Sequence, residues 1–315
     1  MSVLVYTESW EGKFRKSTFE AVSYAHETAK LLVTDVIAIS LGEISNDELN
    51  KLGNYGVGKV ISCREIEKGD SQAASNTIAS LAENSTVIIF SNTYTAKMIA
   101  PRLSVKLKAG IISNVIALSE NIAPLKVKRQ AFSSKAIELA TINTSKAILA
   151  IAPNSFKLIE IGGSCSIEEN NTSEKGALTI ERKETISGKI SISEAEIVVS
   201  GGRGLKGPEN WGMIEELADV LGAATACSKP VSDIGWRPHA EHVGQTGKAV
   251  AADLYIAIGI SGAIQHLAGV NSSKVMVAIN TDPEAPFFKA ADYGIVGDAF
   301  EVVPKLIEEI KKLKG

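Results

Sequence analysis

Apolar, β-branched runs alternate with helix-like segments along the first half of this chain. The strand-like runs span residues 3–6, 36–40, 59–62 and 87–90, and helical periodicity covers residues 17–32, 46–52, 72–81 and 94–107. This alternation predicts a mostly parallel sheet with helical crossovers, because parallel strands need a long connection between them. Residues 126–131, 136–142 and 147–152 are β-rich, which predicts an antiparallel extension of the same sheet.

A polar stretch at residues 164–188 divides the chain. It has too few large apolar residues to build a core, so we expect it to connect two domains. Beyond it the alternation resumes, with strands expected at 197–200, 223–227, 254–260, 275–280 and 293–296 and helices at 209–222 and 303–314. We therefore predict an α/β protein with two parallel-sheet domains. The first is a nucleotide-binding-like domain of residues 1–190, which includes the linker from about 164, and the second is a Rossmann-like domain of residues 191–315.

Composition excludes several classes of protein. The net charge is -3 and the basic residues are dispersed, so we expect no nucleic-acid partner. Cys63, Cys165 and Cys227 are an odd, widely spaced set, which argues against a disulfide framework and a zinc site and favours a reducing cytoplasm. Residues 2–6 already resemble a strand and no apolar run reaches about 18 residues, so we expect neither a signal peptide nor membrane insertion.

Two glycine-rich turns follow predicted strands of the second domain. Gly202, Gly204 and Gly207 form a G-x-G-x-x-G pattern, and residues 259–263 lead into a helix-like segment. Turns of this kind let the backbone approach a phosphate, and a helix start favours an anion. One hypothesis is a nicotinamide-dependent Rossmann oxidoreductase. The acid expected about 20 residues further on is replaced by Cys-Ser-Lys at 227–229, which excludes a standard NAD contact and leaves NADP open.

A second hypothesis rests on four motifs taken together. Residues 236–248 read WRPHAEHVGQTGK, 259–269 read GISGAIQHLAG, 278–286 read AINTDPEAP and 291–298 read ADYGIVGD. This combination resembles the alpha subunit of electron transfer flavoprotein, and a looser likeness extends over the first domain. The resemblance implies an electron carrier without substrate turnover, which holds FAD in its C-terminal domain and pairs with a beta subunit. It implies transfer from dehydrogenases, such as the acyl-CoA dehydrogenases of fatty acid beta-oxidation, to a membrane quinone oxidoreductase.

The resemblance also implies roles for individual side chains. Arg203, Ser228 and Ser261 match positions that contact the FAD pyrophosphate, and a guanidinium and hydroxyls suit phosphate oxygens. Thr246 matches a hydroxyl that hydrogen-bonds flavin N5. His266 matches an imidazole at the pyrimidine edge, where a donor would stabilise negative charge on the reduced flavin.

The full set of cofactor-binding residues implied by the match has no catalytic residue and no metal ligand. It comprises Arg203, Gly204, Ser228, Lys229, His242, Val243, Gly244, Gln245, Thr246, Gly259, Ser261, Gly262, Ala263, Gln265, His266, Asn280 and Asp298. Thr246, His266 and Lys229 are expected to tune the flavin, and Asn280 and Asp298 match the adenosine end.

Each assignment has a simpler alternative. Arg203 could be a solvated surface residue of a glycine turn, and His266 could be an ordinary core histidine. Thr246 could cap a helix-like segment at residues 248–253, since threonine is favoured at that position. These readings stay open on the sequence alone.

Two residues depart from the family pattern. Lys229 stands where an arginine is usual, which keeps the charge but loses the planar, stacking guanidinium. His242 stands where glutamine is common, which adds a titratable group beside the cofactor. Both changes put the redox tuning of the flavin in question.

Overall fold

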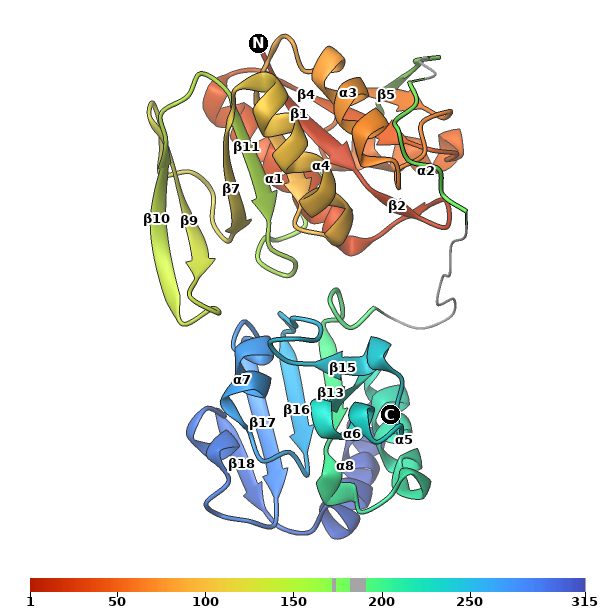
Figure 1. The fold of residues 1–315 in the computed structure, drawn as a ribbon, viewed down its shortest axis with the longest axis vertical. Helices are drawn as coiled ribbons and strands as arrows, with labels where there is room; N and C mark the ends of the chain where they lie inside the picture. Colours follow the sequence, from red (N-terminus) through yellow and green to blue (C-terminus); the bar gives the residue numbers. More distant parts are fainter. Residues whose placement is uncertain (172–173, 182–190, 315) are drawn as a thin grey trace. The chain divides into compact units, whose positions relative to one another are not determined.

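The computed structural model describes residues 1–171, 174–181 and 191–314. The chain forms two compact units, drawn in Figure 1. The first comprises Met1–Ala131 with Ala136–Thr185, and the second comprises Phe132–Lys135 with Ile186–Gly315. The predicted domain boundary at 190 falls at the end of residues 182–190, which lie outside the described residues. That boundary therefore stays a prediction.

A sheet of ten strands, counted over the described residues, forms the centre of the first unit. Its order is β10-β9-β7-β11-β6-β1-β4-β5-β12, with β8 paired to β9. The strands are β1 (Ser2–Thr7), β4 (Asp35–Leu41), β5 (Lys59–Cys63), β6 (Ser85–Ser91), β7 (Gly110–Val115), β8 (Asn121–Ile122), β9 (Leu125–Ala131), β10 (Ala136–Ile142), β11 (Ala147–Ile151) and β12 (Ser166–Glu169). The helices are α1 (Lys16–Leu32), α2 (Asn46–Asn50), α3 (Ser71–Leu81) and α4 (Tyr94–Leu107), and β2 (Ser9–Trp10) pairs with β3 (Lys13–Phe14).

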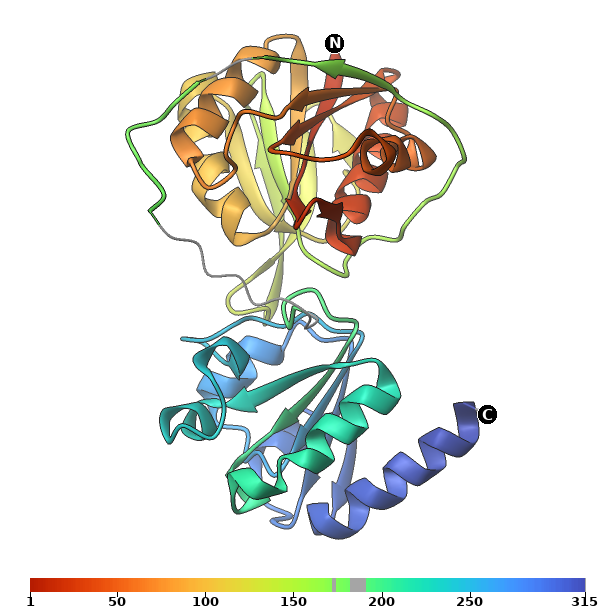
Figure 2. The same ribbon diagram turned by 90° about the vertical axis from the view of Figure 1, so that its right-hand side faces the viewer.

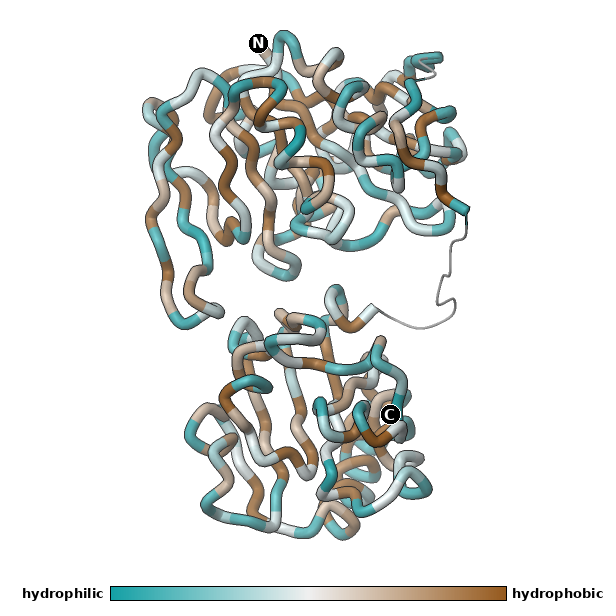
Figure 3. The backbone as a smooth tube through the Cα atoms, in the orientation of Figure 1, coloured by the Kyte–Doolittle hydropathy of each residue, from teal (hydrophilic) through white to brown (hydrophobic). Residues whose placement is uncertain are grey.

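Residues of β1 alternate between two hydrophobic cores, one on each face of this sheet. Val3 and Val5 belong to the core that contains α1, whereas Leu4 and Tyr6 belong to the core that contains α3 and α4. Successive side chains of a strand point to opposite faces, so a fully apolar strand needs helices on both sides. Figure 2 shows the helices on both faces, and Figure 3 shows apolar residues along the central strands.

The predicted antiparallel extension is correct for β9 and β10 and wrong for β11. β9 and β10 pair in antiparallel register, with Ala131 opposite Ala136. β11 instead lies between β6 and β7 and is parallel to both, with Ala147 opposite Val87 and Gly110. All five residues of β11 are buried, which is the pattern of an inner strand covered on both faces.

The polar stretch at 164–188 also contributes to the sheet, in contrast to the linker that we expected. Residues Ser166–Glu169 form β12, which pairs with β5 in parallel. This strand needs no apolar core of its own because backbone hydrogen bonds and surface ion pairs hold it at the edge. Glu168 pairs with Lys59 and Glu169 pairs with Arg64.

Six strands of the second unit, counted over its described residues, form a parallel sheet with the order β15-β14-β13-β16-β17-β18. Numbered along the chain, this is the 3-2-1-4-5-6 order of a dinucleotide-binding fold. The strands are β13 (Ile197–Gly201), β14 (Ala224–Ser228), β15 (His242–Val243), β16 (Leu254–Ile258), β17 (Val275–Asn280) and β18 (Tyr293–Val296). The helices are α5 (Gly212–Leu221), α6 (Lys229–Asp233), α7 (Ile264–Val270) and α8 (Ala299–Lys314).

Three local predictions for the second unit need correction. α8 begins at Ala299 and not at 303, because the Asp298 carboxylate accepts a hydrogen bond from Phe300 N and caps the first turn. Residues 248–253 are not helical, since Lys248 N donates to His242 O and Val250 N donates to Gly269 O. Thr246 is therefore not a helix cap. β15 and α6 were not predicted.

Among the described residues, no helix is long and apolar enough to cross a membrane.

Candidate functional site

The predicted site residues all lie at one edge of the second unit's sheet. Its strands are parallel, so their carboxyl ends share that edge. Arg203 and Gly204 follow β13, Ser228 and Lys229 end β14 and begin α6, and His242 to Thr246 form β15 and its loop. Gly259, Ser261, Gly262, Ala263, Gln265 and His266 follow β16, Asn280 ends β17, and Asp298 follows β18. In open α/β sheets, ligands bind at this edge, where the strand order reverses.

The strand order reverses between β13 and β16, and there the two glycine turns touch. Gly202 N donates to Ile258 O at 2.8 Å, and Gly204 N donates to Gly259 O at 3.1 Å. A Cβ atom on Gly202 would lie 2.1 Å from Gly259 O, and one on Gly204 would lie 2.7 Å from Gly259 Cα. Backbone therefore meets backbone, and Gly259 has a positive φ of 63° that suits glycine.

Exposed donors border these turns. Arg203 lies in a short 3-10 helix after β13 and is exposed, as is Ser261 after β16. Ser228 begins α6 without using its side chain as a cap, and the next residue, Lys229, is exposed. The arrangement leaves a guanidinium, an ammonium and hydroxyls near the centre of the edge.

The loop after β15 makes a tight turn against α7. Gly247 N donates to Gly244 O at 3.0 Å, and Gln245 N donates to Gln265 O at 2.7 Å. A Cβ atom on Gly269 of α7 would lie 2.6 Å from Gly244 Cα, so the two backbones are in close contact. Thr246 and Gln245 are exposed at the tip of this turn, where their side chains are available to a ligand.

His266 is buried in the core beneath this loop, with 6% of its surface exposed. Its Nε2 lies 3.0 Å from the hydroxyl of Tyr255, which is itself fully buried. Within the described part of the chain, Nδ1 has no hydrogen-bond partner. Burial, reinforced by the charge of His242, lowers the pKa of His266 to about 4, while the Val243 backbone opposes the shift. The ring is therefore neutral near pH 7.

His242 occupies β15 and is 5% exposed. Burial lowers its pKa, and the positive charges of Lys229 and His239 act in the same direction, while Asp233 opposes them. His242 thus favours the neutral form in this structure, which reduces the electrostatic consequence of its replacing a glutamine.

Asn280 and Asp298 lie toward the β18 side of the edge. Asn280 Nδ2 donates to Ile260 O at 3.1 Å, so this side chain ties β17 to the turn after β16. Hydrogen bonding from Phe300 N and the nearby charge of Lys206 lower the pKa of Asp298. Asp298 is therefore an acceptor at neutral pH.

The residues at this edge fit FAD. The glycine contacts pack the turns after β13 and β16 backbone to backbone, and the exposed Arg203 and Ser261 of these turns lie where a pyrophosphate would approach. Further along, Thr246 offers a hydroxyl, and the unpartnered His266 Nδ1 is a buried polar atom for which a ligand could supply the missing bond. An elongated dinucleotide with a charged centre and a polar ring matches this donor set.

Two features of the site were not predicted from the sequence. Tyr255 is the partner of His266, and a buried Arg237–Glu241 ion pair precedes β15. The contact of Tyr255 with His266 could not be predicted, because a tyrosine within an apolar strand is typical of any hydrophobic core. The Arg237–Glu241 spacing of four residues was a signal for an ion pair, although not for its burial.

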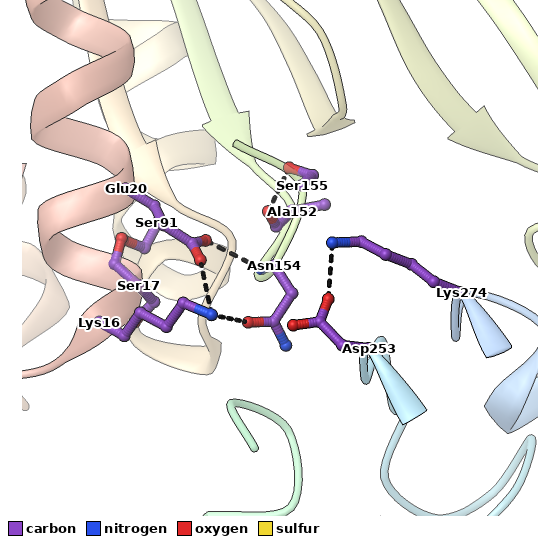
Figure 4. A network of polar contacts seen from close by, with 9 residues as sticks. All are labelled: Lys16, Ser17, Glu20, Ser91, Ala152, Asn154, Ser155, Asp253 and Lys274. Carbon is purple, nitrogen blue, oxygen red and sulfur yellow. Dashed lines mark hydrogen bonds and ion pairs between the residues drawn. The ribbon is translucent and has the colours of Figure 1, made fainter. Parts of the chain in front are cut away.

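At the corresponding edge of the first unit's sheet, the chain's own side chains form a hydrogen-bonded network. Glu20 of α1 is 2% exposed and accepts from Asn154 N at 2.8 Å, and Lys16 donates to Asn154 Oδ1 at 3.2 Å. Figure 4 shows this network together with the bond from Ser91 to Ser17 O. Near the same edge, the Thr93 hydroxyl donates to a Glu8 carboxylate oxygen at 2.5 Å.

Comparisons with known proteins agree with this geometry. A family model described as the electron transfer flavoprotein FAD-binding domain matches residues 191–271, and one described as the electron transfer flavoprotein domain matches residues 3–179. The chain is 41% identical to the electron transfer flavoprotein subunit alpha of Bacillus subtilis (strain 168), covering 99% of this chain and 98% of the relative. It is 34% identical to the subunit of the same name from Syntrophomonas wolfei, covering 98% of each.

These matches select between the two hypotheses. The NADP-dependent oxidoreductase is not favoured, and the C-terminal domain is one that binds FAD. Proteins of this kind transfer electrons without turning over a substrate of their own, and their alpha subunit forms a heterodimer with a beta subunit. By the family models and by identity over nearly its whole length, the chain belongs to the family of electron transfer flavoprotein alpha subunits.

Proposed function

We propose that FAD lies along the carboxyl edge of the β13–β18 sheet, with its pyrophosphate at the turns after β13 and β16. The contact between Gly202 and Gly259 carries this proposal, because it brings the two turns, with Arg203 and Ser261, together at the one place where the strand order reverses. The loop of Gly244 to Thr246 would then hold the isoalloxazine end, and Asn280 and Asp298 would hold the adenosine end.

Bound FAD supplies the redox chemistry, since its isoalloxazine takes up and releases electrons. The chain's own residues bind and orient it. Arg203 and Ser261 donate to phosphate oxygens, and Thr246 donates to the central ring. His266 presents Nδ1 toward the pyrimidine edge while Tyr255 holds its other nitrogen. Lys229 places a positive charge beside the ring system.

We further propose that the subunit receives electrons from dehydrogenases such as acyl-CoA dehydrogenases and passes them to a membrane quinone oxidoreductase. This assignment places it in fatty acid beta-oxidation. The first domain then serves as scaffold and docking surface, and the hydrogen-bonded network at the edge of its sheet supports that role. Cys63, Cys165 and Cys227 are all free thiols, which suits a cytoplasmic location.

The heterodimer purified from native extract tests the function directly. It should be yellow, contain a beta subunit, and release FAD on denaturation. A colourless protein that binds NADPH tightly would contradict the flavin assignment. An isolated alpha subunit fully active with an acyl-CoA dehydrogenase would contradict the need for a partner, and a nucleotide held wholly within residues 1–160 would contradict the scaffold role.

Arg203→Ala should weaken FAD retention more than it changes the midpoint potential, because the guanidinium is assigned to the pyrophosphate. Loss of a hydrogen bond between charged groups costs about 1.5–3 kcal/mol, which is about 10- to 100-fold in the dissociation constant. Equilibrium dialysis of the heterodimer measures this constant. Lys274→Ala is the control, because Lys274 pairs with Asp253 at the opposite edge of the sheet at 2.6 Å (Figure 4). Equal retention in the two variants would remove Arg203 from the site.

Lys229→Ala should lower the midpoint potential of bound FAD, because it removes a positive charge that favours the reduced, more negative flavin. Lys229 is exposed, so water screens the interaction to about 0.2–1 kcal/mol, or about 10–40 mV for one electron. Lys229→Arg should keep the wild-type potential. Spectroelectrochemical titration decides the matter, and identical potentials in all three proteins would mean that the ammonium points to solvent.

A further inference from the structure

A buried ion pair lies directly before the loop that carries His242 to Thr246. Arg237 Nε and Nη2 donate to the two carboxylate oxygens of Glu241, both at 2.7 Å. The side chains are 16% and 7% exposed. This two-pronged geometry fixes both the distance and the orientation of the carboxylate, and it raises the pKa of Arg237.

The same guanidinium is held from the other side by α5. Its Nη1 lies 3.0 Å from Oε1 of Glu215, and its centre lies 5.2 Å from the centroid of the Trp211 ring. Glu215 belongs to α5 and Trp211 immediately precedes that helix. Arg237 therefore connects α5, whose Ile214, Leu217 and Ala218 are buried, to Glu241, the residue just before β15.

The loop depends on such support because β15 is short. It pairs with β14 at only two positions, Cys227 opposite His242 and Ser228 opposite Val243, and it is the edge strand of the sheet. The far end of the loop rests on α7 through the bond from Gln245 N to Gln265 O. The end that precedes β15 is adjacent to the Arg237–Glu241 ion pair.

Stability alone is a poor explanation for this pair. Moving two charges out of water is costly, and apolar side chains of similar volume often replace a buried pair without loss of stability. Binding groups, in contrast, need neighbouring residues that are themselves held in place by packing and hydrogen bonds. We propose that Arg237 and Glu241 are positioning residues of the FAD site, which hold the His242–Thr246 loop in register with α7. The inference rests on the proposed place of FAD.

The test uses the FAD-containing heterodimer with Arg237→Met, Arg237→Lys and Glu241→Gln. Arg237→Met and Glu241→Gln should each raise the FAD dissociation constant about tenfold, as removal of a group that orients a ligand-binding residue commonly does. They should also shift the visible absorption bands of bound flavin toward those of free flavin. Arg237→Lys keeps the positive charge but loses the paired hydrogen bonds to Glu241. Its FAD dissociation constant should therefore lie between those of wild type and Arg237→Met. Glu216→Gln is the matched control, because Glu216 lies next to Glu215 on α5 and its ion pair, with Lys311 of α8, is at the surface.

A purely structural role predicts a different result. Melting temperatures would fall while the dissociation constant and the flavin spectrum stayed at wild-type values, and this outcome would overturn the proposal. If Arg237→Met gives no folded protein, the double variant with Glu241→Gln removes both charges, and it should show the same tenfold loss as one single variant. If Arg203→Ala weakens FAD binding and the Arg237 and Glu241 variants do not, only the positioning role is wrong. If none of these variants weakens FAD binding, the proposed cofactor site is wrong.

Discussion

Gly202→Ala should destabilise the second unit by about 3 kcal/mol and release its FAD. The new Cβ would lie 2.1 Å from the carbonyl oxygen of Gly259 and 2.6 Å from its carbonyl carbon. Both neighbours are backbone atoms, so no side-chain rotation relieves the clash, and the turns after β13 and β16 must move apart. Urea unfolding and the flavin-to-protein absorbance ratio measure the two effects.

Gly212→Ala provides the matched control for this substitution. A Cβ atom there would meet nothing within 4 Å, and the residue begins α5. Alanine favours helix over glycine, so stability should stay within about 1 kcal/mol of wild type or rise slightly. If Gly202→Ala also retained wild-type stability and FAD, the close contact of the two turns would be refuted.

Acidification should weaken the second unit through His266. Burial and the nearby charge of His242 depress its pKa from 6.5 to about 4, so the folded state binds this proton less readily than the unfolded state does. The stabilising contribution is therefore fully present above pH 6.5 and is lost as the pH falls toward 4. The shift corresponds to up to about 3 kcal/mol.

Urea unfolding of flavin-depleted protein between pH 7.5 and about pH 4.5 tests this dependence. His266→Gln should be less stable than wild type at pH 7.5, because it loses the imidazole that contacts the Tyr255 hydroxyl. Its stability should fall less steeply with acid, because glutamine does not titrate. The carboxylates titrate in both proteins, so the difference between the two slopes of unfolding free energy against pH gives the contribution of His266 alone. Parallel curves for wild type and variant would show that His266 does not take up a proton on unfolding.

The sequence was most informative where one segment determines its own structure. The predicted bounds of β17 and β18 agree with the structure residue for residue, because an apolar run between turn formers marks a strand, whether it is largely buried as in β17 or exposed as in β18. The place of β11 was not predictable in this way. Its neighbours are set by pairing with β6 and β7, and five buried residues give no sign of direction.

The same distinction applies to the candidate site. Its glycine turns could be found from local sequence, but their contact depends on β13 lying beside β16, with Ile197 opposite Leu254. The prediction of a helix at 248–253 was wrong because Lys248 N donates back to His242 O and Val250 N donates to Gly269 O, which is far away in the sequence. The role of Arg237 was missed for a similar reason, since Glu215 and Trp211 reach it from another helix.

The strand order also determines when the cofactor site can exist during synthesis. β13 leaves the ribosome before β14 and β15, yet its neighbour on the other side is β16, so the Gly202–Gly259 contact must wait for a much later segment. Asn280 and Asp298 emerge later still. Non-local pairings of this kind form slowly and expose apolar strands meanwhile. At the proposed site, FAD can therefore be bound in full only after translation has passed Asp298, and an early supply of flavin would give no protection to β13 and β14.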